Sequence, residues 1–282
     1  MSLRYAYNTN GCAHHRLPDA LRLIAGAGYD GVALTLDWHH LDPLAPDWRE
    51  RTEAVAAQLR ALGLGCVIET GARYLLDPQV KHEPTLINPT AEGRRVRVDF
   101  LRRAIDVAAI LEAETVSFWA GIRQAAVPEA SALAYLEDGL LAVCAYARER
   151  GVVPSFEPEP GMFVETNADY RQLIDRHPQL NETLRLALDL GHMWVTGEGE
   201  PADAIRTYRH RLGTVSIEGM DRGIHLHRPL HEGDMPIRPL ISALRDIAFP
   251  GLVCVELSRE SPRAHLAIPE SIAHLRNIEQ SL

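Results

Sequence analysis

The 282-residue chain is 46% hydrophobic and 24% charged, which is ordinary for a soluble globular protein. Its net charge of −9 argues against a polyanionic partner such as nucleic acid, which needs a basic protein face. No apolar run approaches the roughly 18 residues of a membrane span, and the first residues lack a signal-peptide pattern. We therefore expect a cytoplasmic protein that has neither nucleic acid nor a membrane as its partner.

Eight short apolar runs alternate with amphipathic stretches along the chain. The predicted strands are 3–7, 32–36, 64–69, 115–119, 152–157, 184–189, 214–217 and 252–256. Helical periodicity covers 18–27, 47–62, 91–111, 129–150, 168–176, 201–208, 238–247 and 264–279. This alternation indicates parallel strands joined by right-handed crossovers. Eight such units predict one α/β domain over residues 1–282, a single (β/α)8 TIM barrel.

Two further features bear on this fold. Gly63, Gly151 and Gly213 each stand between a predicted helix and the next predicted strand, where glycine supplies a left-handed helix cap. A doubly wound open sheet would instead carry a glycine-rich phosphate fingerprint after its first strand, and residues 8–12 do not form one. The barrel is therefore favoured over the open sheet.

Several predicted strands end in a carboxylate. These residues are Glu69, Glu157, Asp189 and Glu256. In a barrel, chemistry takes place where the strands end and the following loops begin, so the four side chains converge on one axial pocket. Like charges at that distance repel unless a cation or a basic residue lies among them. Each acid could instead cap a loop N–H, but the set as a whole favours a cation site.

Histidines gather at the same end of the predicted strands. His192 follows Asp189 by three residues, and His14 follows the first strand. His225 and His227 are two residues apart, which places both imidazoles on one side of an extended segment. Histidines in this arrangement indicate metal coordination or proton transfer.

The second half of the chain resembles a known family. The residues that carry the resemblance are Phe-Glu-Pro-Glu-Pro-Gly at 156–161, Leu-Asp-Leu-Gly-His at 188–192 and Val-Glu-Leu-Ser at 255–258. In this order and spacing they resemble the xylose-isomerase-like barrel superfamily. That superfamily includes sugar phosphate isomerases and epimerases, inosose dehydratases and family 2 apurinic endonucleases. The strand–helix alternation extends the resemblance to the whole chain.

The resemblance implies a divalent cation, which could be manganese, zinc, cobalt, iron or magnesium. By position, Glu157, Asp189 and Glu256 look like three of its ligands. The epimerase branch has a fourth ligand, a histidine in strand seven, at the place where this chain has Ser216. Serine is a poor ligand for such metals, so four-ligand coordination is in doubt.

The endonuclease-like branch has a further cluster to which this chain offers matching residues. Its members resemble His192 and, in the loop after strand seven, the pair His225 and His227. The chain could therefore have lost one ligand and kept a neighbouring imidazole-rich position. We accordingly count His192 and His227 among the candidate metal ligands.

The resemblance implies an isomerase or epimerase of carbohydrate metabolism that acts on a sugar, sugar phosphate or cyclitol. The cation would act as a Lewis acid in forming an enediolate. Glu157 and Glu256 would remove and return the proton, a contribution of about 10²–10⁴-fold. The candidate substrate-binding residues are His14, Glu69, Arg73, Trp119, Glu159, His225 and Arg259. The two arginines could hold an anionic or hydroxyl group, while Trp119 is either a wall for a sugar ring or a core aromatic.

Three alternatives stay open. A cyclitol dehydratase or lyase would use the same metal and the same base. A metal-free relative that only binds a metabolite is kept open by Ser216. An apurinic endonuclease is disfavoured by the acidic composition and by the same serine. Barrels of this family often pair, so a homodimer is possible.

Overall fold

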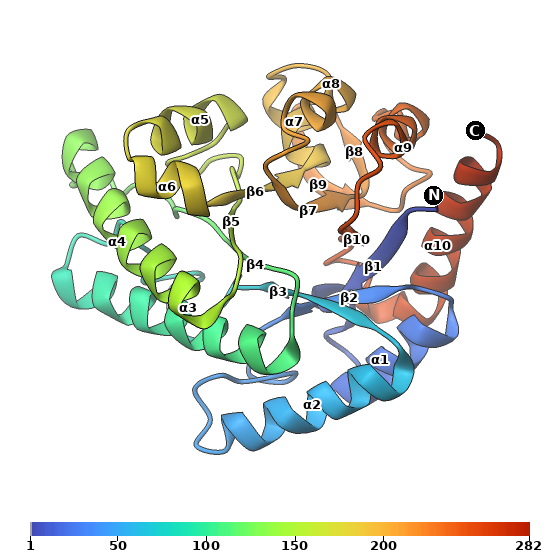
Figure 1. The fold of residues 1–282 in the computed structure, drawn as a ribbon, viewed down its shortest axis with the longest axis horizontal. Coiled ribbons are helices and arrows are strands. Elements are labelled where there is room, and N and C mark those ends of the chain that lie inside the picture. Colours follow the sequence, from blue (N-terminus) through green and yellow to red (C-terminus); the bar gives the residue numbers. More distant parts are fainter. Residues whose placement is uncertain (1) are drawn as a thin grey trace.

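Eight parallel strands close into a barrel in the computed structural model, which describes residues 2–282 (Figure 1). Around the barrel the strand order is β1-β10-β7-β6-β5-β4-β3-β2, so neighbours in space are neighbours along the chain except where a hairpin intervenes. The predicted (β/α)8 TIM barrel is confirmed.

The predicted elements recur with their ends shifted by no more than two residues. The barrel strands are β1 (Arg4–Asn8), β2 (Gly31–Thr35), β3 (Gly65–Glu69), β4 (Val116–Phe118), β5 (Pro154–Phe156), β6 (Arg185–Asp189), β7 (Leu212–Ile217) and β10 (Leu252–Val255). The matching helices are α1 (Leu17–Gly26), α2 (Trp48–Leu62), α3 (Ala91–Leu111), α4 (Glu129–Arg150), α5 (Asn167–Asp175), α8 (Pro201–Thr207), α9 (Ile237–Asp246) and α10 (Ala264–Gln280).

Some short elements were not predicted from the sequence periodicity. They are the helices α6 (Pro178–Thr183) and α7 (Leu190–Thr196), the 3₁₀ turns η1 (Thr9–Cys12) and η2 (Ser261–Arg263), and the strands β8 (Gly219–Asp221) and β9 (Ile224–Arg228). The two strands form an antiparallel hairpin outside the barrel, after β7. Helices of six or seven residues give a weak amphipathic signal, so sequence periodicity reveals some of them, as for α8, and misses others, as for α6 and α7.

The barrel interior changes character along its axis. A small apolar cluster fills part of it, made of Ala6, Ala33, Val67, Leu252 and Cys254. Because side chains of a strand alternate between its two faces, the residue two places further on points into the barrel as well. Two of the predicted acids occupy such places, since Glu69 follows Val67 and Glu256 follows Cys254 by two residues.

The glycine predictions are confirmed in two cases and wrong in one. Gly63 and Gly151 are left-handed caps of α2 and α4, with φ of 68° and 67°. Gly213 instead lies inside β7, where a Cβ atom would come within 2.0 Å of Ser155 Oγ. Its lack of a side chain therefore serves close packing inside the barrel.

Helix α4 is the one described helix whose length and composition would allow it to cross a membrane. It packs against α3 and α6 on the outside of the barrel (Figure 1). A core helix of a globular protein can pass the same test, which considers length and composition alone.

Candidate active site

A cavity of about 480 Å³ opens at the C-terminal ends of the barrel strands. Most of the predicted site residues line it, namely Glu69, Arg73, Trp119, Glu157, Glu159, His192, His225, His227, Glu256 and Arg259. Asp189 is 3% exposed and lies beside His192, outside the cavity lining. Volumes of this size suit a small molecule.

Three carboxylates meet at the base of the site and are called here the carboxylate cluster: Glu157, Asp189 and Glu256. One oxygen from each lies within 4.8 Å of the others. Glu157 follows β5, Asp189 ends β6 and Glu256 follows β10, so three strands hold the cluster. Three of the four strand-end acids therefore lie together, while Glu69 lines the same cavity outside this group.

Neighbouring groups orient these carboxylates. Ser117 donates its hydroxyl to Glu157 Oε2 at 3.3 Å. Asp189 caps α7, because its Oδ1 accepts the backbone N–H of His192 at 2.8 Å. The side-chain amide of Asn10 donates to Glu256 Oε1 at 2.8 Å.

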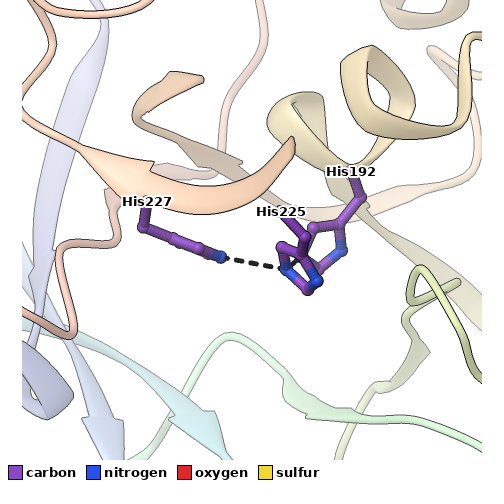
Figure 2. Close-up of side chains that lie close together, drawn as sticks. All are labelled: His192, His225 and His227. Carbon is purple, nitrogen blue, oxygen red and sulfur yellow. Dashed lines mark hydrogen bonds between the residues drawn. The ribbon is translucent and has the colours of Figure 1, made fainter. Parts of the chain in front are cut away.

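Above the carboxylates lies the histidine cluster, formed by His192, His225 and His227. Figure 2 shows the three rings turned toward one another, one from a helix and two from a strand. His225 Nε2 lies 3.1 Å from His192 Nε2 and 3.4 Å from His227 Nε2. His192 lies in the first turn of α7. His225 and His227 lie on β9, which meets the condition of an extended segment under which two-residue spacing places both rings on one side.

The two clusters are in contact through His192. Its Nε2 lies 3.7 Å from Asp189 Oδ2, and its Nδ1 lies 3.7 Å from Glu157 Oε1. Burial lowers the pKa of His192 to about 4, so the ring is neutral at pH 7 and has a lone pair to offer. His227 is held separately, with Nδ1 3.1 Å from the backbone oxygen of Glu256.

Burial also acts on the acids. It raises the pKa of Glu157 and of Glu69 well above the usual range, and the neighbouring carboxylates raise them further. Burial, followed by the charges of Glu256 and Asp189, raises the pKa of Glu159 to about 8. Acids crowded in this way either hold protons or accept a cation.

The residues of the carboxylate cluster fit a divalent cation. Asp189 Oδ2 is buried and receives no hydrogen bond from residues 2–282. Within the same range no lysine or arginine forms an ion pair with Glu157, Asp189 or Glu256. Carboxylate oxygens with an imidazole nitrogen alongside are a common donor set for manganese, zinc, cobalt or iron.

The chain matches the family model described as "Xylose isomerase-like TIM barrel" over residues 21–278. The protein belongs to the xylose isomerase-like TIM barrel family. No curated protein sequence matches the chain.

Solved structures that are similar to this family member share its fold at low sequence identity. One is 3-keto-D-glucoside 4-epimerase YcjR from E. coli (19% identity, TM-score 0.76, 98% of this chain and 99% of that one). A second is the IolI protein with a bound zinc atom (15%, 0.77, 99% and 99%). A third is AsbF from Bacillus anthracis, a probable 3-DHS dehydratase (17%, 0.77, 98% and 99%).

Trp119 and three basic residues shape the mouth of this barrel's cavity. Trp119 is 5% exposed and stacks against the buried guanidinium of Arg97, which lies 4.4 Å from its ring centre. Arg73 and Arg259 line the cavity as predicted, and Lys81 joins them. The mouth therefore carries positive charge above an acidic base.

His14 is placed differently from the other predicted residues. After β1 the chain enters η1, which carries His14 to an exposed position outside the cavity lining. There its Nδ1 lies 2.6 Å from the hydroxyl oxygen of Ser261. The short turn, which the periodicity does not reveal, is the reason for this difference.

Several residues of the site were not among the predicted ones. Asn8, Asn10, Thr35, Lys81 and His82 line the cavity. Glu218 lies just beyond β7 and is 0% exposed. The period-two rule contained a signal for Glu218, since it stands two residues after the inward-facing Ser216.

Proposed function

We propose that the protein is a divalent-metal-dependent isomerase or epimerase of a small polyhydroxylated carbonyl compound, namely a sugar, sugar phosphate or cyclitol. The observation that carries the proposal is the carboxylate cluster, whose oxygens lie within 4.8 Å at the base of the cavity. Glu157, Asp189 and Glu256 would hold the ion, with His192 beside them. When bound, the ion supplies Lewis acidity toward a carbonyl and an adjacent hydroxyl.

Glu157 and Glu256 are the proposed proton-transfer pair. One carboxylate would take the proton from the carbon next to the carbonyl, and the electron pair of that C–H bond would pass toward the carbonyl oxygen as an enediolate forms. The other acid would return a proton to the opposite face of that carbon or to the neighbouring carbon. A hydrogen bond orients each carboxylate, from Ser117 to Glu157 and from Asn10 to Glu256. General acid–base catalysis of this kind contributes about 10²–10⁴-fold.

The remaining lining residues would bind and orient the substrate. Trp119 offers a flat apolar wall, and Arg73, Lys81 and Arg259 offer positive charge at the mouth for a phosphate, carboxylate or hydroxyl group. His227 lines the cavity from β9, and its Nδ1 lies beside the backbone oxygen of Glu256. This position suits a hydrogen bond from the imidazole to a substrate hydroxyl. The similarity to an epimerase is in line with this class of reaction, and the similarity to a zinc-bound protein is in line with a divalent ion.

A dehydratase is the second candidate, and one observation favours it. Glu159 lines the cavity, and its pKa of about 8 keeps it protonated at pH 7. Such an acid could protonate a departing hydroxyl group, which would leave as water after a carboxylate had removed the proton from the adjacent carbon. The similarity to a probable dehydratase is in line with this reading.

The test combines metal analysis with proton exchange. Protein purified without an affinity tag would be analysed for metal by mass spectrometry and then incubated in D2O with free ketoses, ketose phosphates and cyclitol ketones. We expect about one equivalent of metal, and deuterium in one substrate at the carbon next to the carbonyl. A product with the same molecular formula as the substrate, apart from the deuterium, supports isomerisation. A product that has lost one molecule of water identifies the dehydratase.

A control and the contrary results follow from the same design. The exposed surface variant Glu92→Gln on α3 should retain both metal and exchange. Bound metabolite without metal or exchange would move the assignment to a metal-free binding protein. Cleavage of abasic-site DNA with added zinc or manganese, in place of exchange, would identify an endonuclease.

A further inference from the structure

Arg97 is a buried cation that the proposed chemistry does not use. It lies on α3, is 0% exposed and is absent from the lining of the cavity. Its neighbour Arg95 forms ion pairs along the helix, whereas no acid between residues 2 and 282 forms one with Arg97. Burial lowers the pKa of Arg97 to about 9, so the guanidinium still carries its charge at pH 7.

Much of the hydrogen-bonding capacity of this guanidinium is unused. Nη2 donates to the backbone oxygen of Thr70 at 3.1 Å. Nε and Nη1 have no hydrogen-bond partner within the described part of the chain. A buried charge with open donors destabilises a fold, and an apolar side chain of similar volume is often neutral or stabilising in such a place. The stability of the barrel therefore does not account for an arginine at position 97.

The guanidinium is held against two aromatic rings. Its central carbon lies 4.4 Å from the ring centre of Trp119 and 5.2 Å from that of Phe100. The quadrupole of an aromatic ring attracts a cation above its face, most strongly for tryptophan and where water is excluded. Trp119 lines the cavity and Arg97 does not, so the guanidinium lies behind the indole as seen from the cavity.

The indole of Trp119 has few other supports. Its N–H donates no hydrogen bond within residues 2–282, unlike that of Trp194, which donates to Asp234 at 2.5 Å. The ring of His82 meets the indole at 83°, with 5.2 Å between the ring centres, but the connection between β3 and α3 carries this histidine. Arg97 is carried by a regular helix of 21 residues. It is therefore the more rigid of the two supports.

We propose that Arg97 is a positioning residue that acts through Trp119, because it holds the indole plane as the wall against which the substrate packs. Since Trp119 is the apolar wall of the proposed function, this inference rests on that function. Through Thr70, which follows β3, Arg97 also fixes the wall relative to the barrel. A wall contacts substrate and transition state alike, so the effect falls on substrate binding and not on the chemical step.

The first measurement needs no substrate. The near-UV circular dichroism of Trp119 is isolated by subtracting the spectrum of Trp119→Phe from that of the wild type, and the subtraction is repeated in an Arg97→Met background. Fixed tertiary packing gives aromatic side chains their near-UV signal. We expect the Trp119 band to be lost in Arg97→Met, with the far-UV spectrum unchanged. Arg97→Lys, which keeps the charge but not the planar fork, should give an intermediate band.

The chain offers a matched control on the same helix. The guanidinium of Arg103 lies 4.2 Å from the ring centre of Trp48 and donates to the backbone oxygen of Pro43 at 3.0 Å. It therefore has the same kinds of contact as Arg97, but neither Arg103 nor Trp48 lines the cavity. Arg103→Met should leave the Trp119 band as it is in the wild type.

The second measurement uses the compound that exchanges deuterium in the test of the proposed function. Arg97→Met should raise its KM by about 10-fold with kcat unchanged, which is the size of loss expected for one desolvated cation–π contact. In a Trp119→Ala background the same substitution should have no further effect on KM, because Arg97 acts only through the indole.

Three results would overturn the inference: an unchanged Trp119 band in a folded Arg97→Met protein, a fall of kcat with KM unchanged, or an equal effect on KM with and without the indole. Should Arg97→Met not fold, Arg97→Lys is compared with Arg103→Lys. A weaker Trp119 band in the first variant alone supports the inference, and equal bands contradict it. Failure of every compound to exchange deuterium would contradict the proposed function, while the dichroism would still decide whether Arg97 holds Trp119.

Discussion

The carboxylate cluster and the histidine cluster lie in contact, yet they are built on different parts of the molecule. The carboxylates stand at the ends of strands that belong to the closed barrel, and Asp189 is almost fully buried. The histidines come from the short helix α7 and from β9, and His225 is exposed to solvent (Figure 2). A closed ladder holds its residues rigidly, whereas a surface hairpin adapts more easily. We therefore expect metal affinity to depend on the first cluster and substrate handling on the second.

The largest effect is expected for Asp189→Asn. Replacing the most buried carboxylate of the cluster removes one of the three proposed ligands of the ion, so metal affinity should fall by more than about 100-fold and turnover should be lost. Metal content by mass spectrometry, with circular dichroism as the check on folding, measures this. Full metal content in the folded variant would remove the carboxylate cluster from consideration as the metal site.

Glu256→Gln removes a proton acceptor at a carboxylate that is also a proposed metal ligand. The amide keeps the shape and the contact with Asn10 but cannot take up a proton, so we expect kcat to fall by about 10²–10⁴-fold while the fold is unchanged. Turnover would be measured with metal at saturation. A fully active variant would rule out Glu256 as one of the proton-transfer pair.

The pH dependence of stability should distinguish His192 from the acids. Burial lowers its pKa in the folded protein to about 4, from 6.5 in an unfolded chain, so the unfolded chain binds the proton first as pH falls. The contribution of His192 is therefore fully present above pH 6.5 and is lost as the pH falls toward 4, by at most roughly 3 kcal/mol. His192→Gln should flatten this slope in urea unfolding of metal-free protein. An identical slope in both proteins would contradict the neutral buried ring.

The smallest effect is expected for His227→Ala. Its ring is held by the backbone of Glu256 and stands above the carboxylates, so its removal should raise KM by about 10-fold through the loss of one hydrogen bond to substrate. Metal content should stay near one equivalent. Loss of the metal in this variant would place the ion among the histidines and would reverse the comparison.

The sequence predicts the barrel and the acids at its open end because both follow from a simple period. Alternation of two residues along each strand places Glu157, Asp189 and Glu256 inside, and closure of the sheet then forces them together. The pairing of His225 and His227 on one side of β9 follows from the same rule. These are the parts of the site that regular backbone geometry determines.

Other parts depend on segments with no repeating pattern. His14 is carried outward by a single 3₁₀ turn, and Lys81 and His82 reach the cavity from the long connection between β3 and α3. Glu218 follows the period-two rule, but that rule alone does not distinguish a buried acid of the site from one that meets solvent beyond a strand end. Its complete burial appears only in the folded chain, and no one-dimensional pattern contains it.

The hairpin of β8 and β9 forms a sheet of its own and shares no ladder with the barrel. In evolutionary terms, the sequence of this hairpin can change without breaking a hydrogen bond of the barrel ladder. Two residues of the histidine cluster, His225 and His227, lie on this hairpin. Exchange of this one segment between family members is therefore a simple way for selection, or for an enzyme engineer, to change which molecules reach the same carboxylate cluster.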